Sequence, residues 1–191
     1  DPAVDLRGMA EWKDGVVTRL TRGVEQLCEN AGVNLVAGRA EFADEHTARI
    51  VHQGEGEGAE TVDFEHAVVS TGSRPVELPD VPFGLDGVVS SRGLLELERV
   101  PDSLLVVGAG YIGMELSTVF AKLGADVTVI EALEDALPGY EDDVTRTVRE
   151  RAESLGVDFS FGLAATDAES RPDDTVRLTA ETETGENRDI D

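Results

Sequence analysis

Three glycines, Gly108, Gly110 and Gly113, form the spacing G-x-G-x-x-G within the stretch LLVVGAGYIGMEL. In this pattern the first glycine permits a tight turn, and the second lets the backbone approach a pyrophosphate. The third lets a helix pack closely on a strand. The N-terminus of that helix would present free N–H groups and a positive dipole end to the anion. The spacing alone is a weak signal, so its flanking elements decide whether it predicts a dinucleotide site.

A carboxylate follows the glycines at the expected distance. Glu131 lies 18 residues after Gly113 and ends the apolar run 125–131. At that position a carboxylate accepts hydrogen bonds from the adenosine ribose hydroxyls and repels a 2′-phosphate. We therefore expect NAD(H) rather than NADP(H), and the alternative is that Glu131 is one of many solvated acids.

Groups that could carry out acid–base, nucleophilic or metal chemistry do not form a recognisable motif. His46, His52 and His66 lack a carboxylate or hydroxyl at a motif spacing, and Cys28 is the only cysteine. Cys28 falls on the apolar face of a predicted helix, which favours a buried, unreactive thiol. The acids in 140–144 suit a helix start through dipole complementarity alone. The residues therefore predict a cofactor site with no catalytic residue and no metal.

The charge of the chain is strongly acidic. Asp and Glu total 40 against 16 Lys and Arg, which gives a formal net charge of −24, and the acids are spread along the whole chain. A dispersed acidic excess disfavours nucleic acid and anionic membranes as partners. No run approaches the roughly 18 apolar residues of a membrane helix, and no secretory signal is visible. We expect a cytoplasmic protein from a salt-loving organism, where salt screens the self-repulsion.

The pattern of apolar residues changes near Val100, where we place a domain boundary. Before it, the sequence predicts a helix ended by Gly32, an antiparallel meander, an apolar strand with a turn, a Pro/Gly-rich crossover and a short helix. The helix is predicted at 10–31, and the strands of the meander at 34–38, 40–43, 48–52 and 60–64. The apolar strand with its turn falls at 66–75, the crossover at 76–87 and the short helix at 91–101.

After residue 100, strands and helices alternate. Strands are predicted at 103–110, 125–131 and 157–162, helices at 111–124 and 140–156, and a terminal hairpin on the same sheet at 174–191. Short links between such elements imply parallel strands with right-handed crossovers. The glycine spacing therefore lies between a strand and a helix, which is the context that a dinucleotide site needs.

Several segments together resemble a known family. The glycine stretch and the following VTVIEALEDALPGYEDDV are similar to the NAD-binding domain of flavoprotein disulfide reductases, most closely their dihydrolipoamide dehydrogenase branch. Residues 67–79 and 12–42 resemble parts of that family's FAD-binding domain. The resemblance covers nearly the whole chain. It implies an α/β fold in which a Rossmann-like NAD-binding domain, residues 100–191 and C-terminally incomplete, follows a partial FAD-binding domain, residues 1–99, with an antiparallel β-meander.

The resemblance also implies roles for individual residues. Glu131 would hold the ribose, Ala164 would lie against the adenine, and Tyr111 would be either a gate over the flavin or a packing residue. The other implied NAD contacts are Gly108, Ala109, Gly110, Ile112, Gly113 and Glu115. The implied FAD contacts are Thr71, Gly72, Ser73 and the backbone of Ala40.

The chain also departs from the family's pattern. It contains no first G-x-G-x-x-G for FAD, no Cys-x4-Cys redox pair, no late Gly-Asp motif and no His–Glu pair. We therefore expect an internal fragment of an enzyme that oxidises dihydrolipoamide through a redox disulfide and FAD and reduces NAD. The implied partners are a small-molecule or lipoyl-domain substrate, a second copy in a homodimer, and a possible 2-oxoacid dehydrogenase complex.

Alternatives to dihydrolipoamide dehydrogenase remain open from the sequence. A mercuric, coenzyme A-disulfide or glutathione-type reductase would share the same motifs. A non-catalytic NAD-binding or sensing module would fit the visible residues without any redox centre.

Overall fold

The computed structural model describes residues 4–52, 58–173 and 175–190. By their contacts, residues 13–74 form one compact unit, and residues 75–191 with 1–12 form another. The predicted boundary at residue 100, between a part that binds FAD and a part that binds NAD, stays a prediction. None of the described helices is long and apolar enough to cross a membrane.

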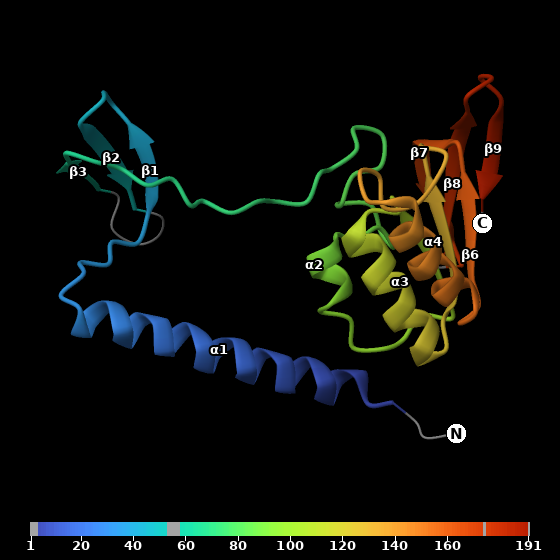
Figure 1. Cartoon of the computed structure of the whole chain (residues 1–191), viewed down its shortest axis with the longest axis horizontal. Coiled ribbons are helices and arrows are strands. Elements are labelled where there is room, and N and C mark those ends of the chain that lie inside the picture. The colour runs from blue at the N-terminus through green and yellow to red at the C-terminus, as the bar shows by residue number, and fades with distance from the viewer. Residues whose placement is uncertain (1–3, 53–57, 174, 191) are drawn as a thin grey trace. The chain divides into compact units, whose positions relative to one another are not determined.

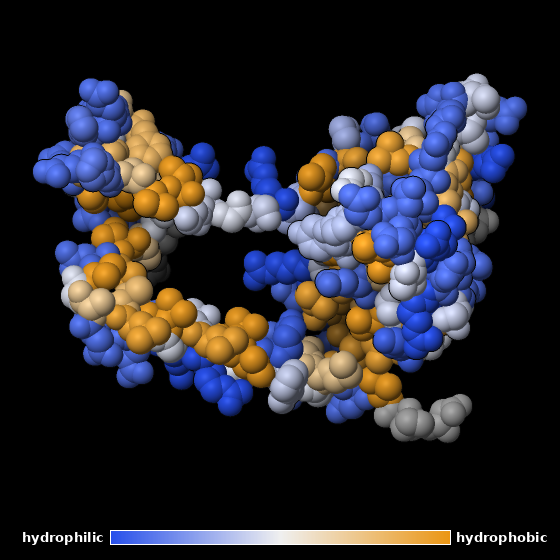
Figure 2. All heavy atoms as spheres, in the orientation of Figure 1, coloured by the Kyte–Doolittle hydropathy of each residue, from blue (hydrophilic) through white to orange (hydrophobic). Residues whose placement is uncertain are grey.

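The unit of residues 13–74 contains most of a long helix and an antiparallel meander. The helix is α1 (Leu6–Asn30), and the strands β1 (Arg39–Phe42), β2 (Thr47–Val51) and β3 (Ala59–Asp63) pair in that order (Figure 1). The predicted helix is confirmed, and the predicted meander is confirmed for its strands at 40–43, 48–52 and 60–64. The expected burial of Cys28 is wrong, because α1 contains no buried residue and the thiol is only half-buried. Apolar side chains therefore lie exposed along α1, as Figure 2 shows in orange.

Two predicted strands in this unit do not form. Residues 34–38 and 66–75 are extended or irregular, and none of the described strands pairs with them. Val68 is 90% exposed and Val69 67% exposed. Their apolar, β-branched character favours a strand, but a strand also needs a neighbour to accept its backbone hydrogen bonds.

The unit of residues 75–191 is built around a parallel sheet. The strands β4 (Ser103–Val107), β5 (Asp126–Glu131) and β6 (Val157–Phe161) lie in the order β4-β5-β6 and are all parallel. The crossovers are α3 (Tyr111–Leu123) and α4 (Asp142–Glu153). Gly124 ends α3 with a φ of 101°, a conformation that glycine adopts without strain. The predicted strand–helix alternation is confirmed.

The C-terminal residues form a second sheet instead of extending the first. The strands β7 (Leu163–Ser170), β8 (Val176–Thr182) and β9 (Asn187–Ile190) pair antiparallel in that order. The predicted hairpin exists, but its expected place on the parallel sheet is wrong. The sequence did not predict β7, whose run LAATDAES lacks strong strand formers. Its backbone pairs with β8 along its whole length, apart from one irregularity between Ala165 and Asp167.

The predicted helix at 91–101 is much shorter than expected. The observed helix α2 (Ser91–Leu94) is a single turn, and its N-cap Ser90 accepts a hydrogen bond from the Gly93 N–H. Residues 95–97 continue only as tight turns with bonds to the third residue back. Gly93 at the centre of this segment weakens helix propagation.

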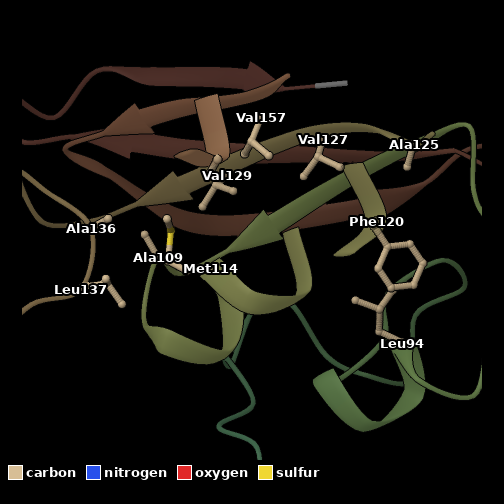
Figure 3. Close-up of a cluster of buried hydrophobic side chains, with 11 residues drawn as sticks. Leu94, Ala109, Met114, Phe120, Ala125, Val127, Val129, Ala136, Leu137 and Val157 are labelled. Carbon is tan, nitrogen blue, oxygen red and sulfur yellow. The ribbon is translucent and has the colours of Figure 1, made fainter. Parts of the chain in front are cut away.

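The side chains of the parallel sheet pack on both of its faces. Val127 and Val129 lie against Met114 and Phe120 of α3 (Figure 3). Ile130, on the alternate face of β5, packs with Leu163, Leu178 and Ala180 of the antiparallel sheet. The helices and the second sheet therefore cover opposite faces of β5, which holds the carboxyl end of β5 in place between them.

Candidate dinucleotide-binding site

The three motif glycines have different structural roles in the turn between β4 and α3. Gly108 has a φ of 101°, and its N–H donates to the Ile130 carbonyl of the neighbouring strand at 2.8 Å. A Cβ on Gly113 would lie 2.0 Å from the carbonyl oxygen of Gly108. These two positions therefore require glycine for the turn and for the close approach of the helix to the strand.

Gly110 differs because its missing side chain leaves open space. It is the N-cap of α3, has ordinary extended backbone angles, and a Cβ built there meets nothing within 4 Å. The first helical bond runs from the Met114 N–H to the Gly110 carbonyl at 2.9 Å, and no side-chain bond caps the helix. Residues 111–113 thus present the uncapped N–H groups of a helix start beside a backbone that a phosphate can approach. This arrangement fits a pyrophosphate.

Glu131 ends β5 next to this turn. Its Oε2 accepts the Ala109 N–H at 2.8 Å, and its Oε1 accepts the Leu133 N–H at 3.0 Å. The carboxylate therefore ties the glycine loop to the end of β5, a bond that the sequence did not predict. An ionised carboxylate has about four lone-pair sites, so Glu131 can still accept bonds from two ribose hydroxyls.

The segment 132–141, which follows Glu131, is also hydrogen-bonded to the glycine loop. The Leu137 N–H donates to the Ala109 carbonyl at 2.8 Å, and the Gly162 N–H donates to the Leu133 carbonyl at 3.1 Å. Leu137 has a φ of 51°, which is rare for a residue other than glycine, and its side chain is buried. Both backbone polar groups of Ala109 are thus bonded, one to Glu131 and one to Leu137. Sequence reasoning missed this segment, and only the Pro-Gly after Leu137 signals a turn.

The remaining predicted NAD contacts, apart from Ala164, lie in the glycine turn and at the start of α3. Ala109 is fully buried inside the turn, whereas Tyr111, Ile112 and Glu115 are exposed on the first turns of α3. Ala164 is exposed on β7, two residues after the Gly162 that follows β6, and it pairs with Glu181. The structure thus brings the glycine loop and Glu131 into direct contact and places Ala164 in the second sheet.

The predicted FAD contacts belong to the other unit. Ala40 lies on β1 opposite Ile50, and its side chain is exposed. Thr71, Gly72 and Ser73 lie exposed in the extended segment that follows the meander. Gly72 has a φ of 69°, so the chain turns there in a conformation that favours glycine.

Hydrogen bonds stabilise the charged form of two carboxyls in turns. The pKa is lowered for Asp44, mainly by the backbone N–H of His46, and for Asp173, mainly by the hydroxyl of Thr175. Asp44 belongs to the unit of residues 13–74, and Asp173 lies in the turn between β7 and β8. Among the residues that the structure describes, no group of three or more His, Cys, Asp or Glu could hold a metal ion. The open backbone at Gly110 and the carboxylate of Glu131 beside it suit the binding of a dinucleotide.

Comparison with known proteins gives the family. Residues 2–191 match the family described as pyridine nucleotide-disulphide oxidoreductase. The chain belongs to this family. It is 64% identical over 178 residues to dihydrolipoyl dehydrogenase 2 of Haloarcula marismortui, a match that covers 93% of the chain and 38% of the relative. It is 56% identical over 191 residues to dihydrolipoyl dehydrogenase of Halobacterium salinarum, covering 100% of the chain and 40% of the relative.

The fold agrees with this membership. LpdA from Mycobacterium tuberculosis superposes with a TM-score of 0.82 at 22% identity, over 97% of this chain and 41% of that one. At this identity the likeness shows the fold alone. The chain thus spans about two fifths of the length of the relatives it matches. The resemblance inferred from the sequence is confirmed at the level of the pyridine nucleotide-disulphide oxidoreductase family.

Proposed function

We propose that the protein containing this chain is a dihydrolipoamide dehydrogenase that uses FAD and NAD. The observation that carries the proposal is the glycine loop bonded to Glu131, in a chain that matches dihydrolipoyl dehydrogenases along nearly its whole length. The net reaction converts dihydrolipoamide and NAD⁺ into lipoamide, NADH and a proton. When bound, FAD carries the electron pair between a redox disulfide and the nicotinamide, which receives it as hydride.

The residues of this chain would bind and select the dinucleotide. The N–H groups of residues 111–113 and the open backbone at Gly110 would hold the pyrophosphate, because the helix dipole favours an anion there. Glu131 would accept bonds from the ribose hydroxyls and would repel a 2′-phosphate, which selects NAD over NADP. Ala109, Ile112 and Glu115 would line the loop. Ala164 would lie against the adenine.

Other residues would face the flavin. Thr71, Gly72 and Ser73, together with the Ala40 backbone, would contact FAD from the segment assigned to the FAD-binding domain, residues 1–99. Tyr111, 59% exposed at the start of α3, would cover the flavin until NAD displaces its ring. The NAD-binding domain would comprise residues 100–191 and would continue beyond them in the whole enzyme.

We infer the partners from the same assignment. The substrate would be dihydrolipoamide, free or carried on a lipoyl domain, and the whole enzyme would be a cytoplasmic homodimer, with a 2-oxoacid dehydrogenase complex as its candidate larger assembly. The names of the haloarchaeal relatives support dihydrolipoamide over mercuric, coenzyme A-disulfide or glutathione-type substrates. The dispersed negative charge gives no surface suited to nucleic acid or to anionic membranes.

The test begins with the complete coding frame. We expect it to carry a further G-x-G-x-x-G and two cysteines separated by four residues upstream of Asp1. The purified protein should reduce NAD with dihydrolipoamide. Glu131→Ala should raise KM for NAD and reduce the ratio of kcat/KM for NAD to that for NADP.

Two results would contradict the proposal in different ways. A frame with the cysteine pair but with activity on another disulfide would replace the substrate and keep the cofactors. A frame without any redox cysteines would leave a non-catalytic NAD-binding module.

A further inference from the structure

An arginine outside the glycine loop contacts the segment 132–141, which is hydrogen-bonded to that loop. Arg149 lies on α4, and its Nη1 is 2.8 Å from Oδ1 of Asp135. Its Nε is 3.5 Å from Oε1 of Glu153, and its guanidinium lies over the ring of Phe161 at 5.9 Å. The arginine side chain is only 31% exposed, so this contact is shielded more than an ordinary surface ion pair.

Asp135 occupies the middle of the segment 132–141. On one side of it, the Leu133 N–H donates to Glu131, and on the other side the Leu137 N–H donates to the Ala109 carbonyl. Asp135 therefore lies between the two bonds that connect this segment to the ribose carboxylate and to the glycine loop. Its own contact with Arg149 joins the middle of the segment to the side of α4.

We propose that Arg149 is a positioning residue for the dinucleotide site. Through Asp135 it keeps the segment 132–141 in the conformation that holds Glu131 and Ala109. The inference rests on the proposed function of that site in binding NAD. Arg149 itself touches neither Glu131 nor the glycine loop in any hydrogen bond or ion pair among the described residues. It acts through the backbone of the segment.

The segment needs such a contact for two reasons. Leu137 adopts a left-handed backbone conformation, which persists only where its surroundings hold it. The segment and the start of α4 are also crowded with like charges, at Glu131, Glu134, Asp135, Glu141, Asp142 and Asp143, and lack any Lys or Arg. The cation of Arg149 opposes that repulsion from the side of α4.

The position of Arg149 is fixed relative to the site by the sheet. Phe161, whose ring the guanidinium covers, is in register with Glu131 on the neighbouring parallel strand. Arg149 is thus anchored beside the strand end that carries the ribose carboxylate. Its guanidinium forms ion pairs with Asp135 and with Glu153, and of these two contacts the one with Asp135 is also a hydrogen bond, whereas the buried Nε that faces Glu153 makes none.

Glu153 supplies a matched control for the test. It pairs with the same arginine and is 50% exposed, against 52% for Asp135, but it lies on α4 and not in the segment. Asp135→Ala and Glu153→Ala therefore each remove one ion pair of Arg149, and only the first frees the segment.

The experiment compares these two variants in the full chain, in molar KCl. Amide hydrogen exchange at Leu133 and Leu137 reports the two backbone bonds directly, without any ligand. Asp135→Ala should speed exchange at both amides and weaken NADH binding by about two- to five-fold, as expected for a partly shielded ion pair. It should also narrow the preference for NADH over NADPH, because Glu131 loses its orientation. Glu153→Ala should change none of these.

A double-mutant cycle tests the coupling itself. Arg149→Ala should also speed exchange at both amides, and the variant with both changes should be affected by less than the sum of the two single variants, because both remove the Arg149–Asp135 contact. Arg149→Ala additionally removes the contacts with Glu153 and Phe161, and Asp135→Ala additionally removes the acceptor of the Ala136 N–H. Equal effects of Asp135→Ala and Glu153→Ala, or unchanged exchange at Leu137 in Asp135→Ala, would overturn the role of Arg149. Failure of the unsubstituted chain to bind NADH would instead refute the proposed NAD site and, with it, this inference.

Discussion

Replacing Gly113 by alanine should damage both the fold and the cofactor site. The new Cβ would lie 2.0 Å from the Gly108 oxygen, 3.2 Å from the Gly108 carbonyl carbon and 3.4 Å from Cγ1 of Val106. The two nearest atoms belong to the backbone, so no side chain can rotate away, and α3 must move from β4 by about 1.4 Å to reach an ordinary contact. Overpacking of this kind costs about 1–3 kcal/mol, and we expect the upper end.

The assay combines thermal unfolding with NADH titration in molar KCl. A loss of about 3 kcal/mol should lower Tm by about 6–12 °C for a chain of this size. Because α3 carries the N–H groups of residues 111–113, its displacement should also weaken NADH binding by more than tenfold.

Gly110→Ala is the matched control for this prediction. Its Cβ meets no protein atom and its backbone angles are ordinary, so Tm should fall only by about 2–4 °C, since alanine is worse than glycine as an N-cap by about 1 kcal/mol. NADH binding should nevertheless fall by more than tenfold, because the methyl group would fill the approach to the pyrophosphate. Unchanged melting and binding in Gly113→Ala would refute the close contact of α3 with β4.

Three further predictions concern charge. Glu131→Gln keeps the size of the side chain but gives up one acceptor oxygen, so one of the Ala109 and Leu133 N–H groups should be left unpaired. The variant should lose about 1–2 kcal/mol of stability and discriminate less between NADH and NADPH. An unchanged Tm would contradict the hydrogen bonds to Glu131. Lowering the KCl concentration should lower Tm, because the net charge of −24 is then unscreened, and a salt-independent Tm would refute the halophilic interpretation. Hydrogen bonds from Thr175 lower the pKa of Asp173 in the folded state. They therefore stabilise the turn fully at a pH above 3.8, the ordinary pKa of aspartate, and this stabilisation is lost as the pH falls through the lower pKa of the folded state. An NMR titration should show the Asp173 pKa returning toward its ordinary value in Thr175→Ala.

The sequence predicted those parts of the site that depend on local backbone chemistry. The spacing of Gly108, Gly110 and Gly113 is dictated by one turn between a strand and a helix, and the structure gives each glycine a distinct requirement there. Glu131 was placed at its strand end by periodicity, and its contact with the glycine loop follows from the pairing of β4 with β5.

The sequence could not predict contacts that depend on tertiary arrangement. The bond from Leu137 to Ala109 and the contact between Arg149 and Asp135 join segments whose distances are set only by the packed sheet and helices. The strand β7 was missed because its pairing with β8 outweighs a weak local propensity. The opposite error occurred at 66–75, where strong β-branched character predicted a strand that has no described neighbour to pair with.

We propose above that the glycine loop and Glu131 together bind NAD. The most direct measurement is calorimetric titration of the full chain with NADH and with NADPH in molar KCl, with Gly110→Ala measured in parallel. We expect NADH to bind at least about tenfold more tightly than NADPH, since repulsion of the 2′-phosphate by a nearby carboxylate is worth more than about 1.4 kcal/mol. Gly110→Ala should bind NADH more than tenfold more weakly, while its Tm falls only by about 2–4 °C. Equal affinity for the two nucleotides, or full NADH binding by Gly110→Ala, would contradict the claim.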